Sequence, residues 1–196
     1  MAQIEANAAD DVPTLHRRAM RGFSARVAEV GDDQWALPTP CADWSVRDLV
    51  GHVTGENLWV APLMAGQTVE QVGDRFDGDV LGDDPRAAYD DSAAGALEAV
   101  AGPGAMERTV HLSFGDAPGR EYAMQLVADL VIHGWDLARG IGADERIEPD
   151  LVAAVSIWFA AVADAYRQAG AIGPPPAVPE GADDQTRLLA EFGRSA

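Results

Sequence analysis

The stretch that most constrains this chain is residues 126–140, LVADLVIHGWDLARG, which combines a helical apolar pattern with two acids and an imidazole on one face. Asp129, His133 and Asp136 are spaced by four and three residues, so on an α-helix they share one face, with Cβ atoms about 5–6 Å apart. The adjoining arc carries Leu126, Leu130 and Leu137. Because an unpaired polar group on a core-facing arc costs roughly 2–7 kcal/mol, these side chains need partners. A metal ion is one such partner, since Asp and His are common ligands.

The composition excludes several other classes of protein. The 196 residues carry 32 acidic and 14 basic side chains, a net charge of −18 that repels nucleic-acid phosphates and anionic membrane surfaces. No apolar run approaches the ~18 residues that span a bilayer, and the N-terminus lacks the basic start and apolar run of a signal peptide. We therefore expect a cytoplasmic protein without a nucleic-acid or membrane partner. Because Cys41 is the single cysteine, any metal must be held mainly by nitrogen and oxygen.

Apolar periodicity predicts helices over residues 12–30, 45–66, 85–100, 120–139, 149–168 and 184–192. Ser45 and Asp48 form a capping-box pattern at the start of the second helix, and Gly140 is the predicted stop of the fourth. Residues 107–115 alternate by two, which predicts a short strand or extended arm, and the following DAPG predicts a turn. Residues 67–84 form a long polar connection, typical of a lid or a crossover.

The predicted fold class is all-α: an antiparallel four-helix bundle with a short extended arm and a C-terminal helical appendage. We expect a disordered N-terminus at residues 1–11 and a metal-binding bundle domain over residues 12–170. Residues 171–196 then form a proline-rich tail with a short helix, because four prolines in residues 170–182 exclude a helix there.

Bundles build metal sites from inward side chains on facing helices. His52 on the second helix, with Asp129 and His133 on the fourth, makes a three-ligand set that leaves positions open for water and substrate. The same residues have simpler interpretations. A single helical histidine is more often a hydrogen-bonded core or surface residue, and a D-x-x-x-H pair is often only a side-chain hydrogen bond.

The neighbouring residues also have more than one interpretation. Asp136 either competes with Asp129 as a ligand, or caps the helix end or pairs with Arg139 there. Glu56 is a base, an acceptor for a ligand histidine, or a solvated charge. Three residues are expected to lie outside the site: His16 on a polar helix face, His111 in the strand-like arm, and Cys41 as a structural loop residue.

The segments TPCADWSVRDLVGHV, LVADLVIHGWDLARG and GPPPAVPE resemble the DinB/YfiT-like bundle superfamily. They are most similar to the branch related to the N-terminal domain of mycothiol-dependent maleylpyruvate isomerase, and within it to an actinobacterial group of metal-binding proteins of unknown function. The resemblance implies a metal held by one helical histidine and a carboxylate-x-x-x-His pair, matched here by His52, Asp129 and His133. The isomerase carries Glu where this chain has Asp129, a side chain shorter by one methylene. The isomerase also has a separate C-terminal domain, which we expect to be absent here or reduced to a tail, so its isomerase activity is not carried over.

The leading hypothesis is a divalent-metal-binding protein that acts as a mycothiol- or other thiol-dependent transferase or isomerase. Zn²⁺ is the default metal, with Ni²⁺, Fe²⁺ and Mn²⁺ as alternatives. The partners would be a small-molecule thiol and an electrophile, and Glu56 and Asp136 are the candidate catalytic residues. The alternatives are a non-catalytic small-ligand-binding or stress-response bundle, and a metal-dependent hydrolase with Glu56 or Asp136 as the base. The oligomeric state, monomer or homodimer, stays open.

Overall fold

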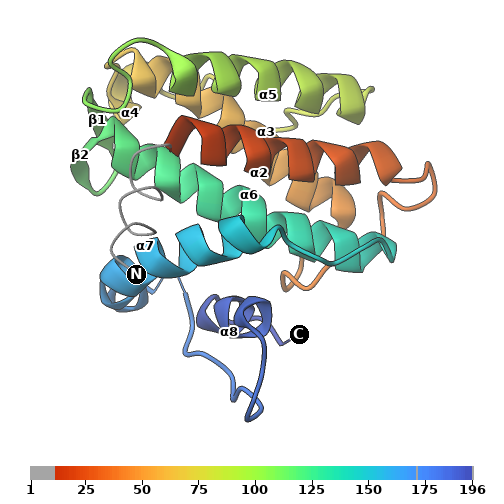
Figure 1. Ribbon diagram of the computed structural model, residues 1–196. Coiled ribbons are helices and arrows are strands. Elements are labelled where there is room, and N and C mark those ends of the chain that lie inside the picture. The colour runs from red at the N-terminus through yellow and green to blue at the C-terminus, as the bar shows by residue number, and fades with distance from the viewer. Residues whose placement is uncertain (1–11, 171, 196) are drawn as a thin grey trace.

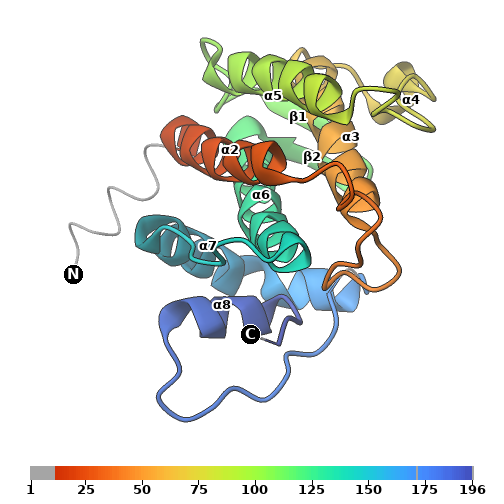
Figure 2. The ribbon, with the colours of Figure 1, turned by 90° about the vertical axis from the view of Figure 1, so that its right-hand side faces the viewer.

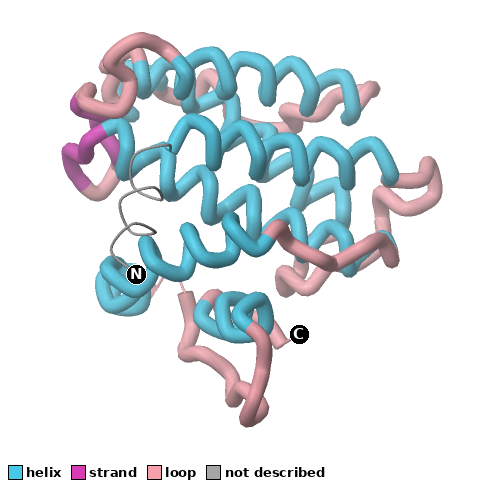
Figure 3. Tube along the Cα trace, viewed as in Figure 1, coloured by secondary structure: helices cyan, strands magenta, loops and turns pink. Residues whose placement is uncertain are grey.

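The computed structural model describes residues 12–170 and 172–195, which form a helical fold with one small β-hairpin (Figures 1 and 3). The predicted all-α class is confirmed, and the predicted N-terminus at residues 1–11 lies outside the described residues. The elements are α2 (Val12–Glu29), α3 (Val46–Met64), α4 (Val69–Val72), α5 (Pro85–Ala101), β1 (Thr109–Leu112), β2 (Gly115–Pro118), α6 (Gly119–Ile141), α7 (Pro149–Gln168) and α8 (Asp184–Glu191).

Helix α6 lies at the centre of the molecule and contacts α2, α3 and α7. Helix α5 packs against α2 and α3 on one side of this core, and α8 packs against α7 on the opposite side (Figure 2). Most of α6 is buried on all sides, including Trp135 and Leu137. Polar side chains on this helix are therefore drawn into the interior, where each needs a hydrogen-bond partner.

Two predicted boundaries around α6 are corrected by the structure. The helix continues through Gly140 to Ile141, and Gly142 caps it in the left-handed conformation at φ 73°. Gly140 instead allows a close approach, because a Cβ there would lie 3.3 Å from the Pro38 carbonyl oxygen. The predicted turn at DAPG is wrong: Gly115–Pro118 forms β2, which pairs antiparallel with β1. The chain reverses between Leu112 and Gly115, before DAPG. The strand predicted within residues 107–115 therefore pairs with the segment that directly follows the reversal.

Helix α4 was not predicted, although its signal is present in the sequence. Thr68 and Gln71 form a reciprocal capping box that starts this single turn inside the polar connection. The connection therefore contains a fixed helical turn next to α3, which α4 contacts.

The C-terminal segment packs back onto the helical core. The Phe192 ring stacks on the Phe159 ring of α7 at 4.2 Å between centroids, and the Ile147 amide donates to Gln185 Oε1 at 2.8 Å. Within the described residues, α7 is the one helix long and apolar enough to cross a membrane, a test that a buried helix of a soluble protein also passes. Leu151, Val155 and Phe159 of α7 are buried inside the protein.

Candidate metal centre

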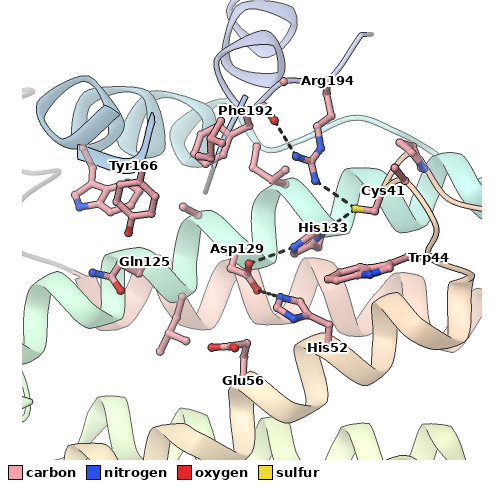
Figure 4. A pocket seen from close by; sticks show the side chains of 18 of the residues that line it. Cys41, Trp44, His52, Glu56, Gln125, Asp129, His133, Tyr166, Phe192 and Arg194 are labelled. Atoms are coloured by element: carbon pink, nitrogen blue, oxygen red, sulfur yellow. Dashed lines mark hydrogen bonds and ion pairs between the residues drawn. The ribbon is translucent and has the colours of Figure 1, made fainter. Parts of the chain in front are cut away.

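The structure brings His52 on α3 together with Asp129 and His133 on α6 (Figure 4). The carboxylate of Asp129 lies between the two imidazoles: Oδ2 is 3.5 Å from His52 Nε2, and Oδ1 is 3.3 Å from His133 Nε2. The two rings meet edge to face with centroids 5.0 Å apart. One candidate ligand atom from each residue lies within 4.8 Å of the other two.

Local sequence explains how α3 presents His52 to α6. The Ser45 hydroxyl accepts a hydrogen bond from the Asp48 backbone amide, and the Asp48 carboxylate accepts one from the Ser45 backbone amide, which fixes where the helix begins. The apolar face that follows is buried, including Leu49 and Val53. His52 lies beside this face, so its ring is half-buried at the edge of the core rather than inside it. On α6, the spacing of four residues places Asp129 and His133 one turn apart.

The two carboxylate–imidazole spacings, each to a different oxygen of Asp129, are compatible with a divalent ion. Ligands at 2.0–2.2 Å around a tetrahedral ion lie about 3.3–3.6 Å from one another. The two carboxylate–imidazole distances of 3.3 and 3.5 Å fall in this range before any adjustment. The Asp129 side chain is 30 % exposed, so the set is open on one side, as a site that also binds substrate must be.

Within the triad, the pKa values of Asp129 and His133 are shifted in opposite directions. Burial alone would raise the pKa of Asp129, but the charge of His133 and hydrogen bonds from both histidines hold that pKa well below its ordinary value. For His133, burial acts to lower the pKa, and the charge and hydrogen bonds of Asp129, with Asp136 and Cys41, raise it well above the ordinary value. His133 therefore holds a proton beside the Asp129 carboxylate, and a metal ion bound at Nε2 would have to displace it.

A second layer of side chains holds the other edge of His133. Its Nδ1 lies 3.1 Å from Asp136 Oδ2, and Arg194 Nη2 donates to the same oxygen at 2.7 Å. Asp136 is 0 % exposed; burial alone would raise its pKa, but hydrogen bonds from His133 and Arg194 lower it. A carboxylate on the second nitrogen fixes the ring orientation and tautomer, as around most metal-binding histidines.

Cys41 completes this second layer from the loop before α3. Its Sγ lies 3.1 Å from Asp136 Oδ2 and 3.6 Å from His133 Nδ1. Cys41, His133 and Asp136 could by spacing hold a cation of their own. Arg194 already supplies that positive charge, because its Nη2 donates to Cys41 Sγ at 3.3 Å as well as to Asp136. Of the two groups, the one with Cys41 and Asp136 therefore already has an arginine bound to it.

Several sequence expectations around the site need correction. Asp136 pairs with Arg194 and not with Arg139, which instead pairs with Glu145 at 2.8 Å. Cys41 contacts the candidate ligand His133, so it is more than a loop residue. No sequence pattern indicated Arg194, because it lies 58 residues from Asp136.

The two remaining histidines lie outside the site, one of them in an unexpected environment. His111 pairs with Asp116 across the hairpin at 2.7 Å, as its place in the arm suggested. His16 does not lie on a polar face: it is 1 % exposed, and neither ring nitrogen has a hydrogen-bond partner within the part of the chain that the structure describes. Burial lowers the pKa of His16 to about 4, so its ring is neutral.

A pocket of about 770 Å³ opens beside the triad. The Trp44 ring forms one wall and lies 4.9 Å from the His52 ring and 5.8 Å from the His133 ring, measured between centroids. Glu56, one turn after His52, also lines the pocket, where burial and the charge of Asp129 raise its pKa. The aromatic residues of the opposite side come from α6, α7 and the C-terminal segment: Tyr122, Trp158, Tyr166 and Phe192.

This combination defines a class: helical proteins with an open His–Asp–His centre beside an aromatic-lined pocket. The family model of the mycothiol maleylpyruvate isomerase N-terminal domain matches residues 16–138, and the chain belongs to this family.

The relatives agree with this assignment. An uncharacterised protein found in two strains of Mycobacterium tuberculosis is 38 % identical over 136 residues, covering 69 % of this chain and 70 % of its own length. The crystal structure of the mycothiol-dependent maleylpyruvate isomerase is similar with a TM-score of 0.60 and 20 % identity, over 74 % of this chain and 67 % of that one. A mutant of that isomerase gives 0.59 and 17 %, with the same coverage. At these identities the structural similarity establishes the fold.

Proposed function

We propose that this chain binds one divalent metal ion through His52, Asp129 and His133, with Zn²⁺ as the first choice and Ni²⁺, Fe²⁺ and Mn²⁺ as alternatives. The observation that carries the proposal is the position of the Asp129 carboxylate, whose oxygens lie 3.5 and 3.3 Å from the Nε2 atoms of the two histidines. The buried contact between His133 and Asp136 supports it, because the second nitrogen of a ligand histidine is commonly held in this way.

We further propose that the site serves a thiol-dependent transfer or isomerisation, with mycothiol or another small thiol and an electrophile as substrates. The family supports this, since the solved relative is named as a mycothiol-dependent isomerase. When bound, a divalent ion supplies the charge that stabilises a thiolate at neutral pH. The pocket beside the triad, about 770 Å³, is large enough for an electrophile next to that thiolate.

The roles of the surrounding residues follow from their environments. Glu56 lines the pocket with a raised pKa, which makes it a stronger proton acceptor than an ordinary carboxylate. Asp136 is the weaker candidate for this role, because its carboxylate is fully buried and is held by Arg194. We assign Asp136 to the positioning of His133, and Trp44 to the exclusion of water from both histidine rings.

The remaining architectural and cellular assignments are proposals of the same kind. We propose that α2, α3, α5 and α6 form the antiparallel four-helix bundle, within a domain of residues 12–170 followed by the tail of residues 171–196. The tail contributes Arg194 to the site, so we treat it as part of the functional unit. We propose a cytoplasmic protein that acts on small molecules.

Elemental analysis of protein purified without a histidine tag tests the metal proposal. We expect about one ion per chain after reconstitution, with the content lost in His52→Ala and His133→Ala but retained in His111→Ala on the hairpin. Wild-type protein without stoichiometric metal would falsify the proposal.

The thiol proposal is tested by metal-dependent consumption of mycothiol with a panel of electrophiles. Turnover without added thiol would instead favour the hydrolase, for which Glu56 would be the base. Metal binding without any turnover would favour a non-catalytic binding protein.

A further inference from the structure

Tyr122 on α6 has a buried hydroxyl with no partner. The side chain lies two helical turns before Asp129, is 4 % exposed and lines the same pocket as Glu56 and the metal triad. Its Oη is buried, and no donor or acceptor within the described ranges lies at hydrogen-bond distance from it. A buried hydroxyl left unpaired destabilises the folded state, so a second use for this group is expected.

A second tyrosine shows that the fold can satisfy such a group. Tyr89 is 0 % exposed, and its hydroxyl lies 2.9 Å from Ser24 Oγ and 3.3 Å from Met20 Sδ. Tyr89 does not line the pocket beside the triad, whereas Tyr122 does. The tyrosine with the unpaired hydroxyl is therefore the one that lines the ligand space, and the tyrosine with the paired hydroxyl is part of the core.

The electrostatics of this end of the pocket define what the hydroxyl can bind. Burial, together with the charges of Glu56 and Asp129, raises the pKa of Tyr122, so the phenol stays protonated and can donate. A carboxylate brought to this position would lose its hydration and would face Glu56, both of which are unfavourable. A neutral carbonyl oxygen accepts a hydrogen bond without either cost.

We propose that Tyr122 is a ligand-binding residue whose hydroxyl donates a hydrogen bond to a neutral carbonyl oxygen of the electrophile, held in the pocket beside His52, Asp129 and His133. The identity of that ligand as an electrophile rests on the proposed function. The presence of a hydrogen-bonding subsite for a carbonyl oxygen rests only on the burial and isolation of the hydroxyl. This subsite selects ketones, aldehydes, esters or amides over acids at this end of the pocket.

Thermal unfolding of two matched variants tests whether the hydroxyl is unpaired. Tyr122→Phe and Tyr89→Phe each remove one buried hydroxyl and keep the ring. We expect the unfolding midpoint of Tyr122→Phe to stay at the wild-type value or rise, and that of Tyr89→Phe to fall. A fall in Tyr122→Phe as large as in Tyr89→Phe would mean that an internal partner, such as a buried water, satisfies the hydroxyl, and the proposal would be wrong.

Ligand-observed NMR with the full chain tests the subsite itself. The probes are cyclohexanone, a neutral and unreactive carbonyl compound, and cyclohexanecarboxylate, the matched anion. We expect cyclohexanone to bind the wild type more tightly than the carboxylate does, and Tyr122→Phe to raise its Kd about tenfold, the effect of losing one hydrogen bond of typical strength. Tyr89→Phe should leave this Kd unchanged. An unchanged Kd in Tyr122→Phe, tighter binding of the carboxylate, or no measurable binding of cyclohexanone to the wild type would each overturn the proposal.

The metal site and the carbonyl subsite fail separately in these experiments. The metal content of wild type and Tyr122→Phe is measured in the same samples, and we expect it to be equal. If neither protein holds metal but the Kd of cyclohexanone is still raised in Tyr122→Phe, the metal proposal fails and the subsite stands. If both hold metal and bind cyclohexanone equally, the subsite fails and the metal proposal stands.

Discussion

At the scale of single residues, the four histidines of this chain show how environment sets the role of one side chain. His52 and His133 share the carboxylate of Asp129, at 3.5 and 3.3 Å. His111 pairs with an exposed aspartate on the hairpin. His16 is buried in the core without a hydrogen-bond partner in the described part of the chain. The first two have the environment of a cation site, and the fourth is a neutral ring that destabilises the fold.

The buried His16 predicts acid sensitivity. Its pKa is about 4 in the folded protein, below the ordinary value of 6.5, because burial disfavours the charged ring. Between these pH values the unfolded chain binds a proton that the folded protein does not, so stability falls as the pH falls, by up to about 3 kcal/mol from this residue. We expect His16→Leu to be more stable than the wild type at pH 7, and the difference to grow as the pH falls from 6.5 to 4.

Urea unfolding of both proteins across this pH range measures the effect. Because Asp129 and His133 titrate in both proteins, the difference between variant and wild type isolates His16. His111→Leu on the exposed hairpin is the control and should gain no stability relative to the wild type as the pH falls, because this side chain is not buried but paired with Asp116. A constant difference between His16→Leu and the wild type across the range would contradict this account.

At the scale of elements, most of the site that could be predicted from the sequence consists of local properties of α6. The spacing of Asp129 and His133 is a local property of one helix, so their shared face was predicted from the sequence alone. The capping box that begins α3 is equally local, and it led to the correct start of that helix. The end of α6 was misplaced because Gly140 was interpreted as a stop signal. The glycine is there for the close approach of residues 38 and 39, which no local pattern indicates.

This interpretation of Gly140 predicts how two Gly→Ala variants will differ. In a helix interior, alanine normally stabilises relative to glycine by about 0.5–1 kcal/mol. A methyl group added at Gly95 in α5 would have nothing within 4 Å, so Gly95→Ala should show this gain. In Gly140→Ala the new methyl would lie 3.3 Å from both the Pro38 carbonyl oxygen and Thr39 Cγ2, so we expect a loss of about 1 kcal/mol instead.

Chemical denaturation of the two variants measures this contrast. The Gly140→Ala change should also disturb the loop that carries Cys41, because Thr39 hydrogen-bonds within that loop through its side chain to the Cys41 backbone. If Gly140→Ala gains as much stability as Gly95→Ala, the close approach of the loop to α6 is not a constraint on this position.

At the scale of the whole molecule, the C-terminal segment joins the site to the rest of the fold. Phe192 stacks on α7, and two residues later Arg194 reaches Asp136 on α6. Residues 171–196 were predicted to be an appendage, because contacts between residues 58 positions apart leave no periodic signal. The place of Cys41 beside His133, 92 positions away, was missed for the same reason. The pairing of β2 with β1 is local and was missed because DAPG was interpreted as a turn, whereas the contacts that join the C-terminal segment and the Cys41 loop to the site depend on how distant segments pack.

The ion pair of Arg194 and Asp136 predicts that the contact between the C-terminal segment and α6 contributes to the free energy of unfolding. Arg194→Ala leaves the fully buried Asp136 carboxylate without its arginine partner. We expect the free energy of unfolding to fall by about 3 kcal/mol, the lower end of the range for a broken buried pair, because Arg194 is itself partly exposed.

Two further variants separate this effect from a general loss of packing. Arg187→Ala on α8 breaks an exposed pair with Asp184 and should cost less than about 1 kcal/mol. In the double variant Asp136→Asn/Arg194→Ala no charge is left unpaired, so it should be more stable than Arg194→Ala alone. Equal stabilities for the single and double variants would show that the charge of Asp136 is not what Arg194 stabilises.

The central claim is that α3 and α6 together hold one cation between His52, Asp129 and His133. Anomalous diffraction at the zinc edge, from crystals of the full chain grown with one equivalent of Zn²⁺, tests it most directly. We predict one peak about 2.0–2.2 Å from a nitrogen of each histidine and an oxygen of Asp129, with Arg194 still bound to Asp136. A peak between Cys41, His133 and Asp136 with Arg194 displaced, or no peak at the triad, would contradict the account.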